Sequence, residues 1–123
     1  MIEMIRKDII PAVTTYMNEI SETLMRKQKI NDMGGNISYN MEQELLERLS
    51  NLSDLLFTQC DGLEESLDNA EKSTTYEERA EYYKSTVHVA MHEARVTADH
   101  LETITAKKYW PFPTYSDLLY SVV

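Results

Sequence analysis

The chain has 123 residues, of which 42% are apolar and 27% are charged, and its formal net charge is −9. This charge disfavours nucleic acid and anionic membrane surfaces as partners, because phosphate groups are bound by basic faces; no segment has the length of a membrane span or the pattern of a signal peptide. Only 3 Gly and 3 Pro indicate long helices, and the single cysteine, Cys60, among apolar neighbours, indicates a buried thiol in the cytoplasm.

The first expected helix covers residues 2–31 of a single domain over residues 1–123. Its apolar positions recur at steps of 3, 4 and 4, an eleven-residue rhythm typical of a nearly straight helix; they are Ile2, Ile5, Ile9, Val13, Tyr16, Ile20 and Leu24. Pro11 interrupts this pattern. Either the helix begins with Asp8 as N-cap or Pro11 kinks a longer helix, and we favour the longer helix because the apolar pattern already begins at Ile2.

The second expected helix covers residues 40–71. Gly34 and Gly35 provide the helix stop before it, and Asn40 with Gln43 has the spacing of a capping box. The same eleven-residue rhythm continues across Gly62, through Met41, Leu45, Leu49, Leu52, Leu56, Cys60, Leu63 and Leu67.

The third expected helix covers residues 75–107. Thr74 with Glu77, or Thr75 with Glu78, has capping-box spacing at its start. Its inward positions include several alanines, which allow close helix packing; they are Tyr76, Ala80, Tyr83, Val87, Met91, Ala94, Ala98, Leu101 and Thr105. Three helices of this length predict an all-α fold, an elongated antiparallel three-helix bundle.

An aromatic and proline-rich tail follows the third helix. Pro111 and Pro113 exclude a helix interior there, so the tail is expected to be extended and to bury its rings on a surface. Thr114 with Asp117 predicts a short last helix over residues 115–120. The tail packs either on its own bundle or on a neighbouring domain or subunit. The candidate docking residues are Tyr109, Trp110, Phe112, Tyr115, Leu118 and Leu119.

Two histidines, His88 and His92, are four residues apart and have the spacing of a helical metal site. They lie outside the apolar pattern and need a third ligand such as Glu81, Glu93 or Asp99, so we favour solvent-facing histidines and expect no metal site. No Glu-x-x-His pair, paired nucleophile or Gly-rich phosphate loop is found in the sequence. We therefore expect no catalytic or cofactor-binding residue.

The tail Trp110-Pro111-Phe112-Pro113-Thr114-Tyr115-Ser116-Asp117-Leu118-Leu119 resembles the C-terminal end of glutamine synthetases. The rest of the chain resembles the C-terminal helical region of the large type III enzymes, through Asp8-Ile9-Ile10-Pro11-Ala12-Val13, Tyr82-Tyr83-Lys84, Ala90-Met91, Arg95 and Ala98-Asp99-His100-Leu101-Glu102. At His88 and His92 the family is expected to have an apolar and an acidic residue, which further weakens the metal interpretation.

This resemblance implies a parent enzyme that joins ammonia to glutamate with ATP and Mg²⁺ or Mn²⁺, through a γ-glutamyl phosphate. The motifs for metal, phosphate and nucleotide have no counterpart in this chain, so no catalytic residue is carried over. The resemblance implies a non-catalytic cytoplasmic helical part that packs against the catalytic domain and neighbouring subunits and supports the oligomer. The alternative is a free-standing helical adaptor whose tail merely resembles this motif.

Overall fold

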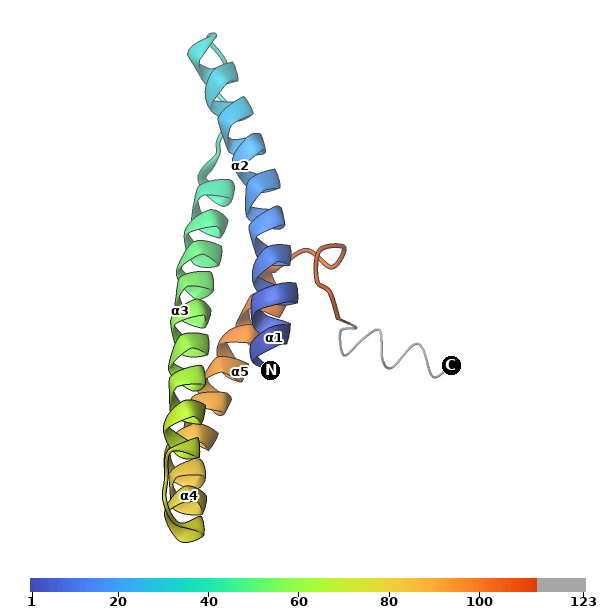
Figure 1. Ribbon diagram of the computed structural model, residues 1–123. Helices are drawn as coiled ribbons and strands as arrows, with labels where there is room; N and C mark the ends of the chain where they lie inside the picture. Colours follow the sequence, from blue (N-terminus) through green and yellow to red (C-terminus); the bar gives the residue numbers. More distant parts are fainter. Residues whose placement is uncertain (113–123) are drawn as a thin grey trace.

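The computed structural model describes residues 1–112, and within this range the chain forms helices and no strand (Figure 1). The expected all-α fold is therefore confirmed, while the expected short helix over 115–120 lies outside the described residues. The helical elements are α1 (Ile2–Met4), the π-helical turn η1 (Ile5–Ile9), α2 (Ile10–Asp32), α3 (Asn40–Glu71), α4 (Tyr76–Tyr82), the π-helical turn η2 (Tyr83–Val87) and α5 (His88–Ile104).

These elements join into three helical rods. The residues where α1, η1 and α2 meet keep right-handed helical dihedrals, so residues 2–32 form one continuous helix. The same holds for α4, η2 and α5 over residues 76–104. This third rod ends earlier than the expected residue 107, because Thr105 is extended, with φ −91° and ψ 135°.

The helix continues through Pro11, which answers the question that the sequence left open. Asp8 lies inside η1 and does not cap the helix. Pro11 lacks an N–H group and its ring crowds the carbonyl four residues earlier. The wider π-helical turn directly before Pro11 accommodates both effects, so the first rod begins at Ile2.

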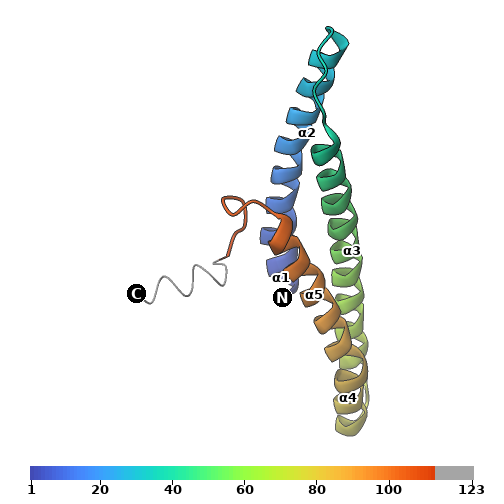
Figure 2. The ribbon, with the colours of Figure 1, turned by 180° about the vertical axis from the view of Figure 1, so that it is seen from behind.

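The rods α1–η1–α2 and α4–η2–α5 both run antiparallel to α3 and pack on it (Figure 1). Figure 2 shows the same arrangement from behind, with α2 extending past one end of the overlap and α4 past the other. Three rods therefore overlap only in the middle of the molecule.

The core occupies this overlap. The main cluster of buried apolar side chains consists of Ile5, Ile9, Val13, Ile20, Leu49, Leu56, Cys60, Ala94 and Leu101. A smaller cluster, Leu63, Ala70 and Val87, joins α3 to η2. Most positions in the middle of the predicted apolar patterns are thus buried, but Met91 in the third pattern is 37% exposed.

Two parts of the predicted patterns are wrong. Met41 is 70% exposed, and the buried residue at that end of α3 is Glu42. Tyr76 and Tyr83 are also exposed, whereas Tyr82 is half-buried against the smaller cluster. The reason is η2, because a π-helical turn holds more residues than an α-helical turn and rotates the preceding helix.

The helix ends follow local chemistry only in part. Thr75 caps α4 by accepting a hydrogen bond from the Glu78 N–H at 3.1 Å, so one predicted capping box is supported. Gly34 has φ 99°, a left-handed conformation suited to glycine, at the end of α2. The capping box at Asn40 is wrong, because α3 already begins at Asn40 and no side chain caps it.

Candidate functional site

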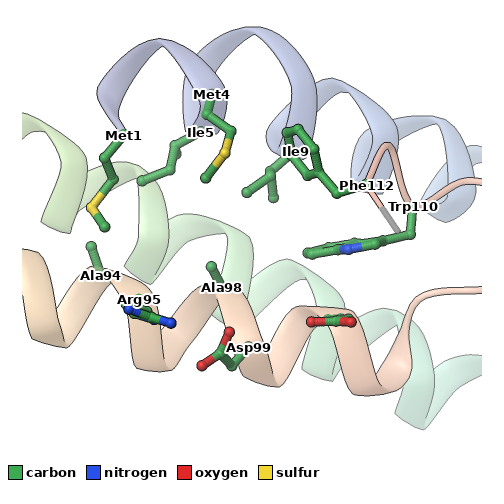
Figure 3. A pocket seen from close by; sticks show the side chains of 11 residues that line it. Met1, Met4, Ile5, Ile9, Ala94, Arg95, Ala98, Asp99, Trp110 and Phe112 are labelled. Carbon is green, nitrogen blue, oxygen red and sulfur yellow. The ribbon is translucent and has the colours of Figure 1, made fainter. Parts of the chain in front are cut away.

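An apolar groove lies between the first rod and α5 and has a volume of about 380 Å³ (Figure 3). One wall comes from α1 and η1, the other from α5, and the tail supplies two aromatic rings. The residues that line it are Met1, Met4, Ile5, Ile9, Ala94, Arg95, Ala98, Asp99, Glu102, Trp110 and Phe112.

The groove exists because one wall is built from small side chains. Ala94 and Ala98 of α5 face Ile5 and Ile9 of the first rod across the groove (Figure 3). A methyl group fills little of the space between two helices, and the first rod and α5 each pack on α3 more closely than on each other. The space between them is therefore left to other side chains.

The tail fills one end of this space. After α5, the N–H groups of Tyr109 and Trp110 bond to the carbonyls of Ala106 and Lys107 at 2.9 and 3.2 Å, and these turns reverse the chain. Trp110 and Phe112 are half-buried and pack against the main core cluster. Figure 3 shows both rings near Ile9, at the end of the groove away from Met1 and Ala94.

Tyr109 attaches the tail to α2. Its ring lies against Tyr16, with 5.5 Å between ring centroids, and its hydroxyl donates a hydrogen bond to Glu19. Lys108 Nζ lies 3.5 Å from the same carboxylate and 4.9 Å from the Tyr109 ring centroid. The hydrogen bond from the Tyr109 hydroxyl is the largest cause that lowers the pKa of Glu19, and the charge of Lys108 lowers it further, against partial desolvation. The same hydrogen bond raises the pKa of Tyr109.

Three of the six candidate docking residues, Tyr109, Trp110 and Phe112, are thus placed on the body of the molecule. The other three, Tyr115, Leu118 and Leu119, lie outside the described residues. Sequence analysis missed the first-rod wall of the groove and also Glu19, the acceptor for Tyr109. Met4 lies outside the predicted apolar pattern. The sequence indicates this wall only through apolar residues near the start of the chain that the pattern does not include.

The histidines His88 and His92 are both exposed on α5. Among residues 1–112, no three or more His, Cys, Asp or Glu side chains are grouped closely enough to hold a metal ion. Cys60 is buried, and desolvation raises the pKa of its thiol. None of the described helices is long and apolar enough to cross a membrane.

The described part of the chain is therefore an all-α unit with an apolar groove that its own tail partly fills. No family model matches it. It is 34% identical to a glutamine synthetase of Butyrivibrio fibrisolvens over 120 residues, which are 98% of this chain and 17% of that protein. It is 25% identical to a glutamine synthetase of Bacteroides fragilis over 114 residues, 92% of this chain and 16% of that protein. The chain is thus similar to one segment of these relatives, about a sixth of their length.

Proposed function

We propose that this chain is the non-catalytic, C-terminal helical part of a type III glutamine synthetase. The observation that carries the proposal is the unequal coverage, 98% of this chain against 17% of the relative. The parent enzyme is an ATP-dependent glutamate–ammonia ligase, and its ATP and Mg²⁺ or Mn²⁺ bind elsewhere in the parent. No residue of this chain is assigned to them. Its cytoplasmic location accords with the free thiol of Cys60.

The role of the helical part is to pack against the catalytic domain and neighbouring subunits and so to support the oligomer. Apolar side chains that remain exposed on the described chain support this role. Phe57 on α3 is 53% exposed although Leu56 beside it is fully buried, and Tyr76 on α4 is 86% exposed. Contact with another protein surface would remove these side chains from water.

The test is deletion of residues 109–123 from the full-length synthetase, followed by measurement of particle mass. We expect smaller particles or a lower unfolding temperature, because the deletion removes Trp110 and Phe112 from the core surface. The matched control is the double substitution His88→Ala and His92→Ala, which changes exposed side chains of α5 and should leave the particle mass unchanged. An unaltered oligomer with normal stability after the deletion would contradict the role.

A second test asks whether the isolated chain has the ligase activity of the parent enzyme. Purified alone, the 123-residue chain should form no glutamine from glutamate, ammonia and ATP. Glutamine formation by the isolated chain would overturn its non-catalytic assignment. A gene that encodes this chain without any synthetase sequence beside it would favour the adaptor alternative.

A further inference from the structure

The groove between the first rod and α5 is only partly filled by the described residues. Trp110 and Phe112 close the end near Ile9 (Figure 3). Met1 and Met4, which line the remainder, keep 42% and 38% of their surfaces exposed. A wall of large apolar side chains beside a half-buried Trp favours an occupant that covers both.

The chain itself continues from this place. Phe112 is the last described residue and lines the groove, and the sequence goes on for 11 residues, Pro113–Val123. The α5 wall of the groove runs from Glu102 to Ala94, a rise of about 12 Å. Eleven residues cover about 16 Å as a helix and more when extended, so the following segment is long enough to line the whole groove.

The composition of Pro113–Val123 suits this apolar groove. Its only charged side chain is Asp117, and its large apolar side chains are Tyr115, Leu118, Leu119, Tyr120, Val122 and Val123. The groove rim carries one basic residue, Arg95, which is available to Asp117, beside the acidic residues Asp99 and Glu102. A segment with a single charge therefore fits better than a strongly charged one.

We propose that Pro113–Val123 docks in the groove of its own chain, with Leu118 and Leu119 in the space that Ala94 and Ala98 leave open. The docked segment covers Trp110 and completes the core on the side where the rods do not meet. This inference concerns the chain alone and does not depend on the proposed function. If the segment docks there, the groove is an internal contact of the chain and is not a surface that another protein binds.

Disulfide trapping in the full chain tests the placement. In a Cys60→Ala background, Ala98→Cys with Leu119→Cys should form an intrachain disulfide under mild oxidation. The control pairs Leu119→Cys with Asp32→Cys, an exposed position at the end of α2, 23 residues beyond Ile9 and about 34 Å along the helix. Seven residues from Phe112 to the new cysteine reach at most about 25 Å, and a disulfide adds about 6 Å between Cα atoms, so the control pair should remain reduced. Equal yields in both pairs would overturn the proposal, and disulfide-linked dimers in place of the intrachain product would assign the groove to a second copy.

The lone Trp110 gives a second measurement without cysteines. Leu118→Ala with Leu119→Ala should raise acrylamide quenching of Trp110 and shift its emission to the red, because the ring loses its cover. The matched control, Ser116→Ala with Ser121→Ala, changes polar residues of the same segment and should leave both readouts unaltered. Circular dichroism of each variant verifies that the three rods are formed. Unchanged quenching in the leucine variant, with the rods intact, would contradict docking of this segment.

Discussion

At the scale of single residues, Tyr109 has the contacts that hold the tail to the body. Its ring packs on Tyr16 and its hydroxyl bonds to Glu19, 90 positions earlier in the sequence. Lys108 adds a second contact to the same carboxylate. Glu19 and Lys108 are exposed, so their charge contacts have small individual effects on stability. The half-buried rings of Tyr16 and Tyr109 hold the adjoining Trp110 toward the groove.

The contact between Tyr109 and Glu19 predicts a pH dependence. The pKa of Glu19 is lowered from its ordinary value of 4.5, so its contribution to stability is present above that pH and is lost as the pH falls through the lowered value. The pKa of Tyr109 is raised from 10.0, so its contribution is present below that pH and is lost as the pH rises further. Tyr109→Phe should therefore lower the unfolding temperature most between these two values.

Thermal unfolding followed by circular dichroism at a series of pH values checks this expectation. The difference between the unaltered chain and Tyr109→Phe should shrink toward both extremes of pH. Thr103→Ala, which removes a hydroxyl that bonds only to the carbonyl of His100, is a control with no such pH profile. A difference that is constant across the whole range would contradict the role of the Glu19 contact.

Glu42 shows why some residues cannot be assigned from sequence. It lies in the first turn of α3, outside the predicted apolar pattern, yet it is buried and its Oε1 lies 2.5 Å from Lys27 Nζ of α2. This ion pair lowers the pKa of Glu42, with Lys27 as the largest cause. The contact depends on how α2 lies on α3, which no local pattern of α3 contains.

At the scale of elements, the glycines differ in what an added side chain would meet. Gly62 lies inside α3, and an added Cβ meets nothing within 4 Å. Gly34 has φ 99° at the end of α2, where any Cβ is strained.

We expect Gly62→Ala to stabilise the chain by about 1 kcal/mol, because alanine favours helix and loses less backbone freedom on folding. Gly34→Ala should destabilise it by about 1–2 kcal/mol, because the left-handed conformation is costly for alanine. Urea unfolding of both variants measures the two free energies. A loss of stability in Gly62→Ala would show that α3 is not regular at that position.

The π-helical turn η2 decides which face of the third rod is buried. Tyr82 and Val87 both contact the smaller core cluster although they are five residues apart, one more than an α-helical repeat allows. Deletion of exposed Ser85 should therefore be tolerated, because an ordinary helical turn then brings Tyr82 and Val87 to the same face at a spacing of four.

Deletion of exposed Glu93, inside regular α5, is the matched control. It turns one half of the rod by about 100° relative to the other and removes a side chain such as Val87 from the core, a loss of at least about 2 kcal/mol. Thermal unfolding compares the two variants. Equal losses from both deletions would indicate that η2 does not hold an extra residue.

At the scale of the whole molecule, stability is expected to be uneven along the rods. Three rods overlap only in the middle, where the main core cluster lies, and two-helix extensions project from both ends (Figure 1). Helices that bury fewer apolar side chains open more readily.

Hydrogen exchange should therefore be slowest for amides between Leu49 and Leu63, which face both other rods. Amides in residues 21–32 and 76–82 should exchange faster, because each of these stretches packs against a single neighbouring segment. Mass spectrometry of peptides from one sample compares the regions directly. Uniform protection along α3 and both extensions would mean that the molecule opens only as one cooperative unit.

The sequence by itself determined the all-α class, the helix stop at Gly34 and a cap at Thr74 or Thr75, because these depend on interactions within a few residues. It also singled out the aromatic tail, since two prolines exclude a helix there. Only the tertiary structure decided the partial overlap of the rods, the rotation at η2 and the open groove. These features depend on how segments that are distant in the sequence pack together. The periodic pattern of apolar residues does not predict the extra residue of a π-helical turn or the space that two alanines leave between two rods.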